Sequence, residues 1–416
     1  MRMKKIFLFL LLVSTMPAAF AQQRTVDEVK KSIGDLSADL KTFTTAQTKM
    51  KNALTNEATK NLPETWFVAG KIEFGIYDKN RVNKSVGNTV DAKAMGTALI
   101  NGYDYFQKAL SLDTIKETNR DGSPKLDKKT GEPKVKTKFS KEIVAKLFSY
   151  VIDFGAIGAD LYKVKEWEKA YKAWDVYHQL ATSPSMKGKM RAEPDSVIGA
   201  MSFYQGLAAS QLKKYPDAHR LFVQAISYGY TKKTVYDNDI NALILMKDTA
   251  GMVNVATQAF KLYGKQDVQY MRIMINDCLR NGNMDDAEVM LDQAILMDSL
   301  NANYYTIKGN IVEDKSSYLD ARPYYKRAVE LSPETYQTNF DMGRSFYLEA
   351  LQYGKDNPKK TGKKLMKVIE PILRTALTYL EKAHELEPGN IDTIGILRDV
   401  YYKIGDGVNL DKLEGK

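Results

Sequence analysis

The sequence of 416 residues contains one Cys, three His and twelve Pro. A single Cys excludes an intramolecular disulfide, and with three scattered His it also excludes a Cys/His zinc cage. The chain lacks the Gly-rich phosphate loop, the His-Glu-x-x-His helix and the Gly-x-Ser-x-Gly elbow of common enzyme classes. With 44% hydrophobic and 27% charged residues, it has the composition of a globular protein with a large core.

The first 21 residues have the pattern of a secretory signal peptide. Three of the first five residues are basic, residues 6–13 are apolar, and residues 19–21 read Ala-Phe-Ala, a small-x-small cleavage site. This apolar run is too short to span about 30 Å of hydrocarbon, and no later stretch is long and apolar enough. No Cys follows the run for lipidation. We expect a periplasmic or secreted protein that begins at Gln22 after cleavage and has no transmembrane anchor.

Positive charge is concentrated in two stretches. Without the signal peptide the net charge falls from +10 to (61 − 3) − 51 = +7. Residues 116–141 hold nine Lys and Arg against four acidic residues, and residues 355–367 hold six Lys against Asp356. We interpret both as solvated insertions; the alternative is that they bind an anionic polymer or a membrane surface. Neither stretch interleaves aromatic residues with its cations, so no nucleic-acid partner is expected.

A repeated pattern of small and bulky residues is the strongest signal. A small residue or Ile is followed 12 residues later by Ala, 16 later by an aromatic residue or Leu, and 19 later by Ala or Tyr. Small residues let two helices cross closely, and the last three positions share one helix face. The pattern therefore predicts paired helices. It occurs at Gly158, Ala170, Trp174 and Tyr177; at Gly206, Ala218, Phe222 and Ala225; at Ile275, Ala287, Leu291 and Ala294; and at Gly309, Ala321, Tyr325 and Ala328.

Residues 303–333 and 376–388 continue the pattern to Pro333 and Pro388, each of which ends a second helix. On these residues the chain resembles the tetratricopeptide repeat (TPR) proteins, of an exported bacterial type, over nearly all of 25–405. The resemblance implies an all-α fold: an α-solenoid of TPR helix-turn-helix repeats, with loop or hairpin insertions.

The expected organisation follows the repeats. Gly70 to Gly102 and Gly343 to Ala376 replace the usual gap of 12 by 32 and 33 residues, so about 20 residues are inserted at 79–98 and about 21 in the eighth unit. Alternating residues and two turn pairs predict a β-hairpin in the first basic insertion. The expected parts are a signal peptide at 1–21, N-terminal helix pairs at 22–113, a basic insertion at 114–139, central repeats at 140–264, C-terminal repeats at 265–390 with a basic insertion near 354–364, and a capping helix and tail at 391–416.

Residues that could carry chemistry fit structural roles better. His178, His219 and His384 lie on second helices of different units, with no Asp, Ser or Cys partner at a catalytic spacing. Cys278 lies within a first helix, where a buried, inert thiol is expected. Lys125 excludes an EF-hand over 121–132, because it occupies a ligand position of the calcium loop.

The TPR resemblance also implies a concave groove, lined by the first helices, in which a partner peptide or helix lies. TPR domains that clamp a C-terminal carboxylate use Lys or Arg and Asn at such positions. Here Ile307 and Asp341 stand where two of these are required, so the full clamp is absent. The alternative is that the groove positions only contact neighbouring helices. The positions expected to face the groove, a polar and partly basic track, are Arg272, Asn276, Asn303, Thr306, Asn310, Phe340, Arg344 and Tyr347.

The repeats, the export signal and the missing catalytic motifs together predict a non-enzymatic scaffold for protein–protein interaction in the cell envelope, without cofactor or metal. Its partner is expected to be a protein or peptide. The alternative is an accessory protein that binds an anionic polymer or a membrane surface through the basic insertions. An enzyme is the least favoured class, because no convergent set of titratable groups is evident. A homo-oligomer that uses the groove on itself is a further alternative, which light scattering would decide.

Overall fold

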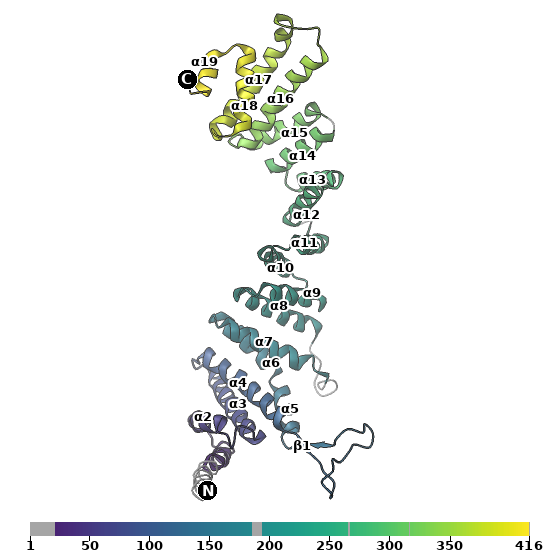
Figure 1. Ribbon diagram of the computed structural model, residues 1–416. Coiled ribbons are helices and arrows are strands. Elements are labelled where there is room, and N and C mark those ends of the chain that lie inside the picture. The colour runs from purple at the N-terminus through teal and green to yellow at the C-terminus, as the bar shows by residue number, and fades with distance from the viewer. Residues whose placement is uncertain (1–20, 185–193, 265–266, 316, 416) are drawn as a thin grey trace, which may run out of the picture. The chain divides into compact units, whose positions relative to one another are not determined.

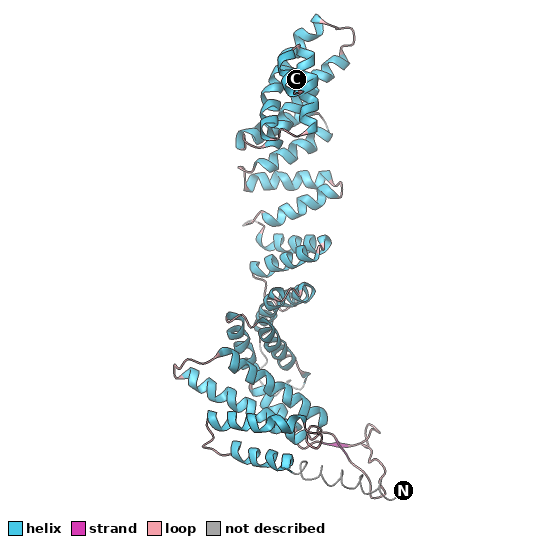
Figure 2. Cartoon of the chain, turned by 60° about the vertical axis from the view of Figure 1, so that its left-hand side comes forward, coloured by secondary structure: helices cyan, strands magenta, loops and turns pink. Residues whose placement is uncertain are grey.

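The computed structural model describes residues 21–184, 194–264, 267–315 and 317–415. Helices account for most of these residues, and the strands among them are confined to one short hairpin (Figures 1 and 2). Except for Ala21, the predicted signal peptide lies outside the described residues. The chain divides into two compact units, one up to Asp248 and the other from Thr249 onward.

The N-terminal unit is a series of helices in which neighbours along the chain pack on each other: α3 on α4, α6 on α7, and α8 on α9. Their connections are short, as is usual for antiparallel helix pairs. The elements are a helix over 21–33, α2 (Leu40–Thr55), α3 (Pro63–Ser85), α4 (Ala92–Leu112), β1 (Ile115–Lys116), β2 (Val135–Lys136), α5 (Ser140–Ser149), α6 (Val151–Lys163), α7 (Trp167–Ala181), α8 (Asp195–Gln211), α9 (Tyr215–Ser227) and α10 (Lys233–Met246).

The C-terminal unit repeats this arrangement. Because α11 packs on α12, the compact division follows α10 and not residue 264, where the sequence separates central from C-terminal repeats. The elements are α11 (Thr249–Tyr263), α12 (Gln269–Arg280), α13 (Met284–Met297), α14 (Ala302–Lys315), α15 (Tyr318–Leu331), α16 (Tyr336–Asp356), α17 (Lys363–Leu386), α18 (Ile391–Ile404) and α19 (Gly407–Leu413).

The repeated sequence pattern is the contact between the helices of each pair. A Cβ atom at Gly309 would lie 2.5 Å from Cε1 of Tyr325, the bulky residue 16 positions later. Gly206 and Gly158 stand in the same relation to their partners, with the added Cβ 2.6 Å from the Phe222 and Trp174 rings. Such distances are shorter than real Cβ contacts, so a side chain at these positions would have to displace the partner ring or the helix that carries it. The prediction of an all-α solenoid built from TPR-type helix pairs is confirmed.

The two long gaps in the pattern are occupied mainly by longer helices. Gly70 of α3 faces Phe106 of α4, where an added Cβ would lie 2.2 Å from the ring. Beyond this contact the inserted residues 79–98 continue both helices, and only 86–91 connect them. In the same way α16 and α17 cross at Gly343 and Leu380 and run on to a connection at 357–362.

Residues 115–136 form a hairpin that extends away from the helices (Figure 1). Ile115 pairs with Lys136, and Lys116 pairs with Val135. The carboxylate of Asp113 fixes the base of the hairpin, because its two oxygens accept hydrogen bonds from the backbone N–H groups of residues 138–140 at 2.7–2.8 Å.

Candidate functional site

A groove of about 690 Å³ lies within the C-terminal unit. Three first helices line it: α14, α16 and α18. Because each is the first helix of its pair, their neighbouring faces form one continuous surface. The lining residues are Asn310, Glu313, Asp314, Gln337, Phe340, Asp341, Arg344, Tyr347, Ile391, Asp392, Gly395 and Ile396.

The structure places half of the predicted groove residues in this groove, namely Asn310, Phe340, Arg344 and Tyr347. The other four do not line it. Arg272 and Asn276 are exposed on α12, and Asn303 is exposed near the start of α14. Thr306 is buried, and its hydroxyl donates to the carbonyl oxygen of Ala302 at 3.2 Å, so this side chain serves its own helix.

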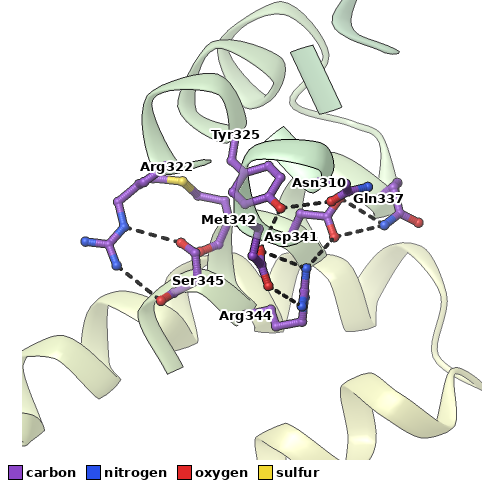
Figure 3. A network of polar contacts seen from close by, with 9 residues as sticks. Asn310, Arg322, Tyr325, Gln337, Asp341, Met342, Arg344 and Ser345 are labelled. Atoms are coloured by element: carbon purple, nitrogen blue, oxygen red, sulfur yellow. Dashed lines mark hydrogen bonds and ion pairs between the residues drawn. The ribbon is translucent and has the colours of Figure 1, made fainter. Parts of the chain in front are cut away.

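Arg344 is held by an ion pair with Glu313 across the groove. Its two terminal nitrogens donate to the two oxygens of Glu313 at 2.7 and 3.1 Å, a bidentate arrangement. The hydroxyl of Tyr325 donates to the same carboxylate at 2.7 Å and lies 2.8 Å from Asn310 Oδ1 (Figure 3). The aromatic residue of the repeat pattern therefore also positions polar groups of the groove.

Asp341 is a second carboxylate of this network and is only 2% exposed. Gln337 donates to both of its oxygens at 3.0 and 2.9 Å, and Arg344 lies 3.8 Å away (Figure 3). Burial raises the pKa of Asp341 from 3.8 to about 6, because a buried carboxylate loses its hydration. At neutral pH this group therefore carries a negative charge that the fold disfavours.

Aromatic side chains line the part of the groove nearest α18. The rings of Phe340 and Tyr336 stack with centroids 5.5 Å apart, and the Tyr336 hydroxyl lies 3.0 Å from Thr393 Oγ1. Tyr347 donates to Asp399 of α18 at 2.9 Å. Burial, followed by this hydrogen bond, raises the pKa of Tyr347 to about 12. Phe340 thus offers apolar surface beside the Tyr347 hydroxyl, which is already hydrogen-bonded to Asp399.

The groove is acidic, in contrast to the partly basic track expected from the sequence. Four carboxylates line it (Glu313, Asp314, Asp341 and Asp392) against one cation, Arg344, whose charge Glu313 neutralises. Asp314 and Asp392 are exposed and pair with no cation among the described residues. Asp314 lies four residues after Asn310, so helix periodicity alone could have placed it in the groove.

The remaining candidates for chemistry have structural surroundings. His219 Nδ1 lies 2.6 Å from the buried carboxylate of Asp239, and His178 Nε2 lies 3.4 Å from Ser202 Oγ. Burial raises the pKa of the Cys278 thiol, which makes it a weaker nucleophile at neutral pH. The described ranges contain no group of three or more His, Cys, Asp or Glu placed to hold a metal ion.

No family model and no curated protein matches the sequence. Solved structures do resemble it in fold. The C-terminal part of a TPR repeat-containing protein from Cytophaga hutchinsonii is 15% identical over 62% of this chain and 92% of its own, with a TM-score of 0.37. A TPR repeats protein from Bacteroides fragilis is 18% identical over 61% and 98%, with a TM-score of 0.28. MamA of AMB-1 is 15% identical over 47% and 94%, with a TM-score of 0.34.

This chain is an α-solenoid of TPR-type helix pairs. That assignment rests on the packing of Gly158, Gly206 and Gly309 against the aromatic rings of their partner residues. None of the helices in the described ranges combines the length and the apolar composition that a membrane span requires.

Proposed function

We propose that this chain is an exported, non-enzymatic TPR scaffold that binds a partner protein in the groove between α14, α16 and α18, through a segment that presents basic residues beside an apolar or aromatic side chain. The observation that carries the proposal is the charge of the groove. Asp314 and Asp392 are exposed and unpaired within the described residues, whereas Arg344 is already neutralised by Glu313.

The shape and polarity of the groove support this kind of partner. Its volume of about 690 Å³ suits side chains of a peptide or a helix laid across it. Phe340, Ile391 and Ile396 supply apolar contact area between the carboxylates. Unpaired carboxylates at the rim attract a cationic segment and penalise an anionic one, so they contribute selectivity more than affinity. A C-terminal carboxylate finds no free cation here.

The pattern of residues 1–21 supports a periplasmic or secreted location, and hence a partner in the cell envelope. The missing catalytic motifs support a scaffold rather than an enzyme. Neither of these inferences uses the geometry of the groove.

Peptide binding tests the proposal directly. We expect a helical peptide with Lys and Leu or Phe on one face to bind the chain from Gln22 onward, and the same peptide with Glu in place of Lys not to bind. The double variant Asp314→Asn, Asp392→Asn should weaken binding roughly 3- to 10-fold, as expected for two exposed ion pairs. Asp411→Asn, an exposed carboxylate on α19, is the matched control. Equal binding of the Lys and Glu peptides would refute the proposal.

A second candidate function is binding of an anionic polymer or membrane surface by the hairpin. Within the hairpin, Glu117 forms ion pairs with Lys125 and Lys136. Several other cations of the hairpin have no carboxylate partner among the described residues. Apolar side chains also protrude, with Leu126 55% exposed. The cations without such a partner are Lys116, Arg120, Lys128 and Lys129, whereas Lys134 interacts with the carboxylate of Asp127.

Sedimentation with vesicles tests this second candidate. We expect anionic vesicles to retain the chain, neutral vesicles not to retain it, and high salt to release it, because exposed charges are screened within about 3 Å at 1 M salt. Replacing residues 118–133 by a short Gly-Ser turn should abolish retention if the hairpin is responsible.

A further inference from the structure

A second pocket, of about 280 Å³, lies in the N-terminal unit between α2, α3 and α4. It is several times the roughly 30 Å³ that one water molecule occupies in the liquid, yet smaller than most sites for drug-sized ligands. Its wall on α2 and α3 includes four apolar residues, namely Met50, Leu54, Ala69 and Ile72. It is separate from the groove and does not depend on the function proposed for the groove.

Glu73 is a buried carboxylate in the wall of this pocket. Its side chain is 2% exposed, and Gln47 Nε2 donates to Oε1 at 2.7 Å. The second oxygen, Oε2, is buried and has no hydrogen-bond partner among the described residues. An unsatisfied buried charge is costly and is retained in a core only with some compensation.

We propose that this pocket binds a protonated primary amine on a short apolar chain, with the ammonium group on Glu73 and the chain against Met50, Leu54 and Ile72. An ammonium donor satisfies the unpaired oxygen and compensates the buried charge in a single contact. The Gln47 and Asn101 amides and the Tyr105 hydroxyl line the same pocket and can serve the remaining ammonium hydrogens.

The other ionisable groups that line the pocket are compatible with this ligand. Lys51 of α2 is exposed and forms no ion pair within the described ranges, so it remains in solvent at the rim. Tyr105 of α4 has a pKa raised by burial and by the charge of Glu73, so it is neutral at physiological pH. Glu73 is thus the single anion of the pocket lining.

The pKa of Glu73 should differ between the free and the occupied pocket. Burial raises its pKa from 4.5 to about 6, against the hydrogen bond from Gln47. A bound ammonium favours the ionised form and lowers this pKa again. Amine binding therefore weakens as the pH falls below about 6, where the carboxyl group takes up a proton.

Three probes of one shape test the proposal by calorimetry on the chain from Gln22 onward: pentylamine, 1-pentanol and pentanoate. We expect pentylamine to bind at pH 8, pentanol to bind at least ten-fold more weakly, and pentanoate not to bind. Acetyl-Gly-Lys-Gly-amide separates two sources of the amine. Its binding assigns the pocket to a Lys side chain of a partner, and binding of pentylamine without it assigns the pocket to a free amine.

Variants at the pocket distinguish recognition from folding. Glu73→Gln keeps the size and the bond to Gln47, and should fold but bind pentylamine about 10- to 100-fold more weakly, the range for hydrogen bonds to charged groups. Lys51→Gln removes a like charge from the rim and should bind it equally or more tightly. Glu57→Gln, at an exposed carboxylate, is the control. Unchanged binding in Glu73→Gln, or pentanol that binds as tightly as pentylamine, would overturn the proposal.

Discussion

Arg344 of α16 donates two hydrogen bonds to Glu313 of α14, at 2.7 and 3.1 Å. The two residues belong to the first helices of successive pairs, so this ion pair connects repeats instead of stabilising a single one. Both side chains are largely buried, with exposures of 29% and 14%. The sequence predicts that Arg344 faces a partner, but in the structure its charge is paired with Glu313. The groove is therefore acidic.

Replacing Glu313 by Gln should destabilise the C-terminal unit. The variant retains an acceptor for Tyr325 but leaves Arg344 with only the more distant carboxylate of Asp341, 3.8 Å away, as a counter-charge, at an expected cost of about 1.5–3 kcal/mol. Urea unfolding followed by circular dichroism measures the loss. The control is Glu370→Gln, which breaks an exposed pair with Arg374 and should cost no more than about 0.5 kcal/mol. Equal losses in the two variants would show that the Arg344–Glu313 pair contributes little.

Asp341→Asn should change how stability depends on pH. The folded-state pKa of about 6 lies above the ordinary value of 3.8, so the folded state holds a proton that the unfolded state has released between these values. This contribution to stability is therefore present at low pH and is lost as the pH rises through about 6. The Asn variant does not titrate.

Unfolding free energies of both proteins at pH 5 and pH 8 measure this effect. Relative to the natural chain, Asp341→Asn should gain about 1 kcal/mol on going from pH 5 to pH 8. If the difference in unfolding free energy between the two proteins did not change with pH, the fold would stabilise the ionised carboxylate of Asp341 enough to offset the effect of its burial.

The sequence predicts the helix pairs well because their packing is encoded at fixed spacings. Gly309 and Tyr325 are 16 residues apart in sequence and touch in space, so a one-dimensional pattern suffices to find them. The same periodicity places Asn310, Phe340 and Arg344 on one face, and the structure brings them into the groove.

The charge of the groove could not be predicted in this way. The pairing of Arg344 with Glu313 depends on how two helices cross, which the spacing within either helix does not specify. Ile391 and Asp392 come from α18, which the sequence indicates only as a solvating cap, yet this helix forms one wall. The pocket at Glu73 was missed for the same reason, because its lining comes from three helices.

If the signal peptide is cleaved as the sequence predicts, the exported protein has a single, calculable mass. Expressed with its full N-terminus in a bacterial host, the chain should be recovered outside the cytoplasm with the intact mass of residues 22–416. Ala19→Asp should block processing, because the site requires small residues at positions 19 and 21. Mass spectrometry of fractionated cells measures both. Recovery of the full-length mass, or of the protein in the cytoplasm alone, would contradict the export prediction.

The contact between Gly309 and Tyr325 predicts opposite effects for two Gly→Ala changes. At Gly309 the new methyl group would lie 2.5 Å from a ring whose hydroxyl is held by Asn310 and Glu313, so the ring cannot easily move aside. We expect Gly309→Ala to destabilise the C-terminal unit by about 1–3 kcal/mol, the usual cost of overpacking a core. Gly354 lies in α16 with no atom within 4 Å of an added Cβ, so Gly354→Ala should stabilise by up to about 1 kcal/mol through helix propensity. Thermal or urea unfolding decides between the two signs. If both variants were stabilised, the close crossing of α14 and α15, and with it the physical basis of the repeat pattern, would be wrong.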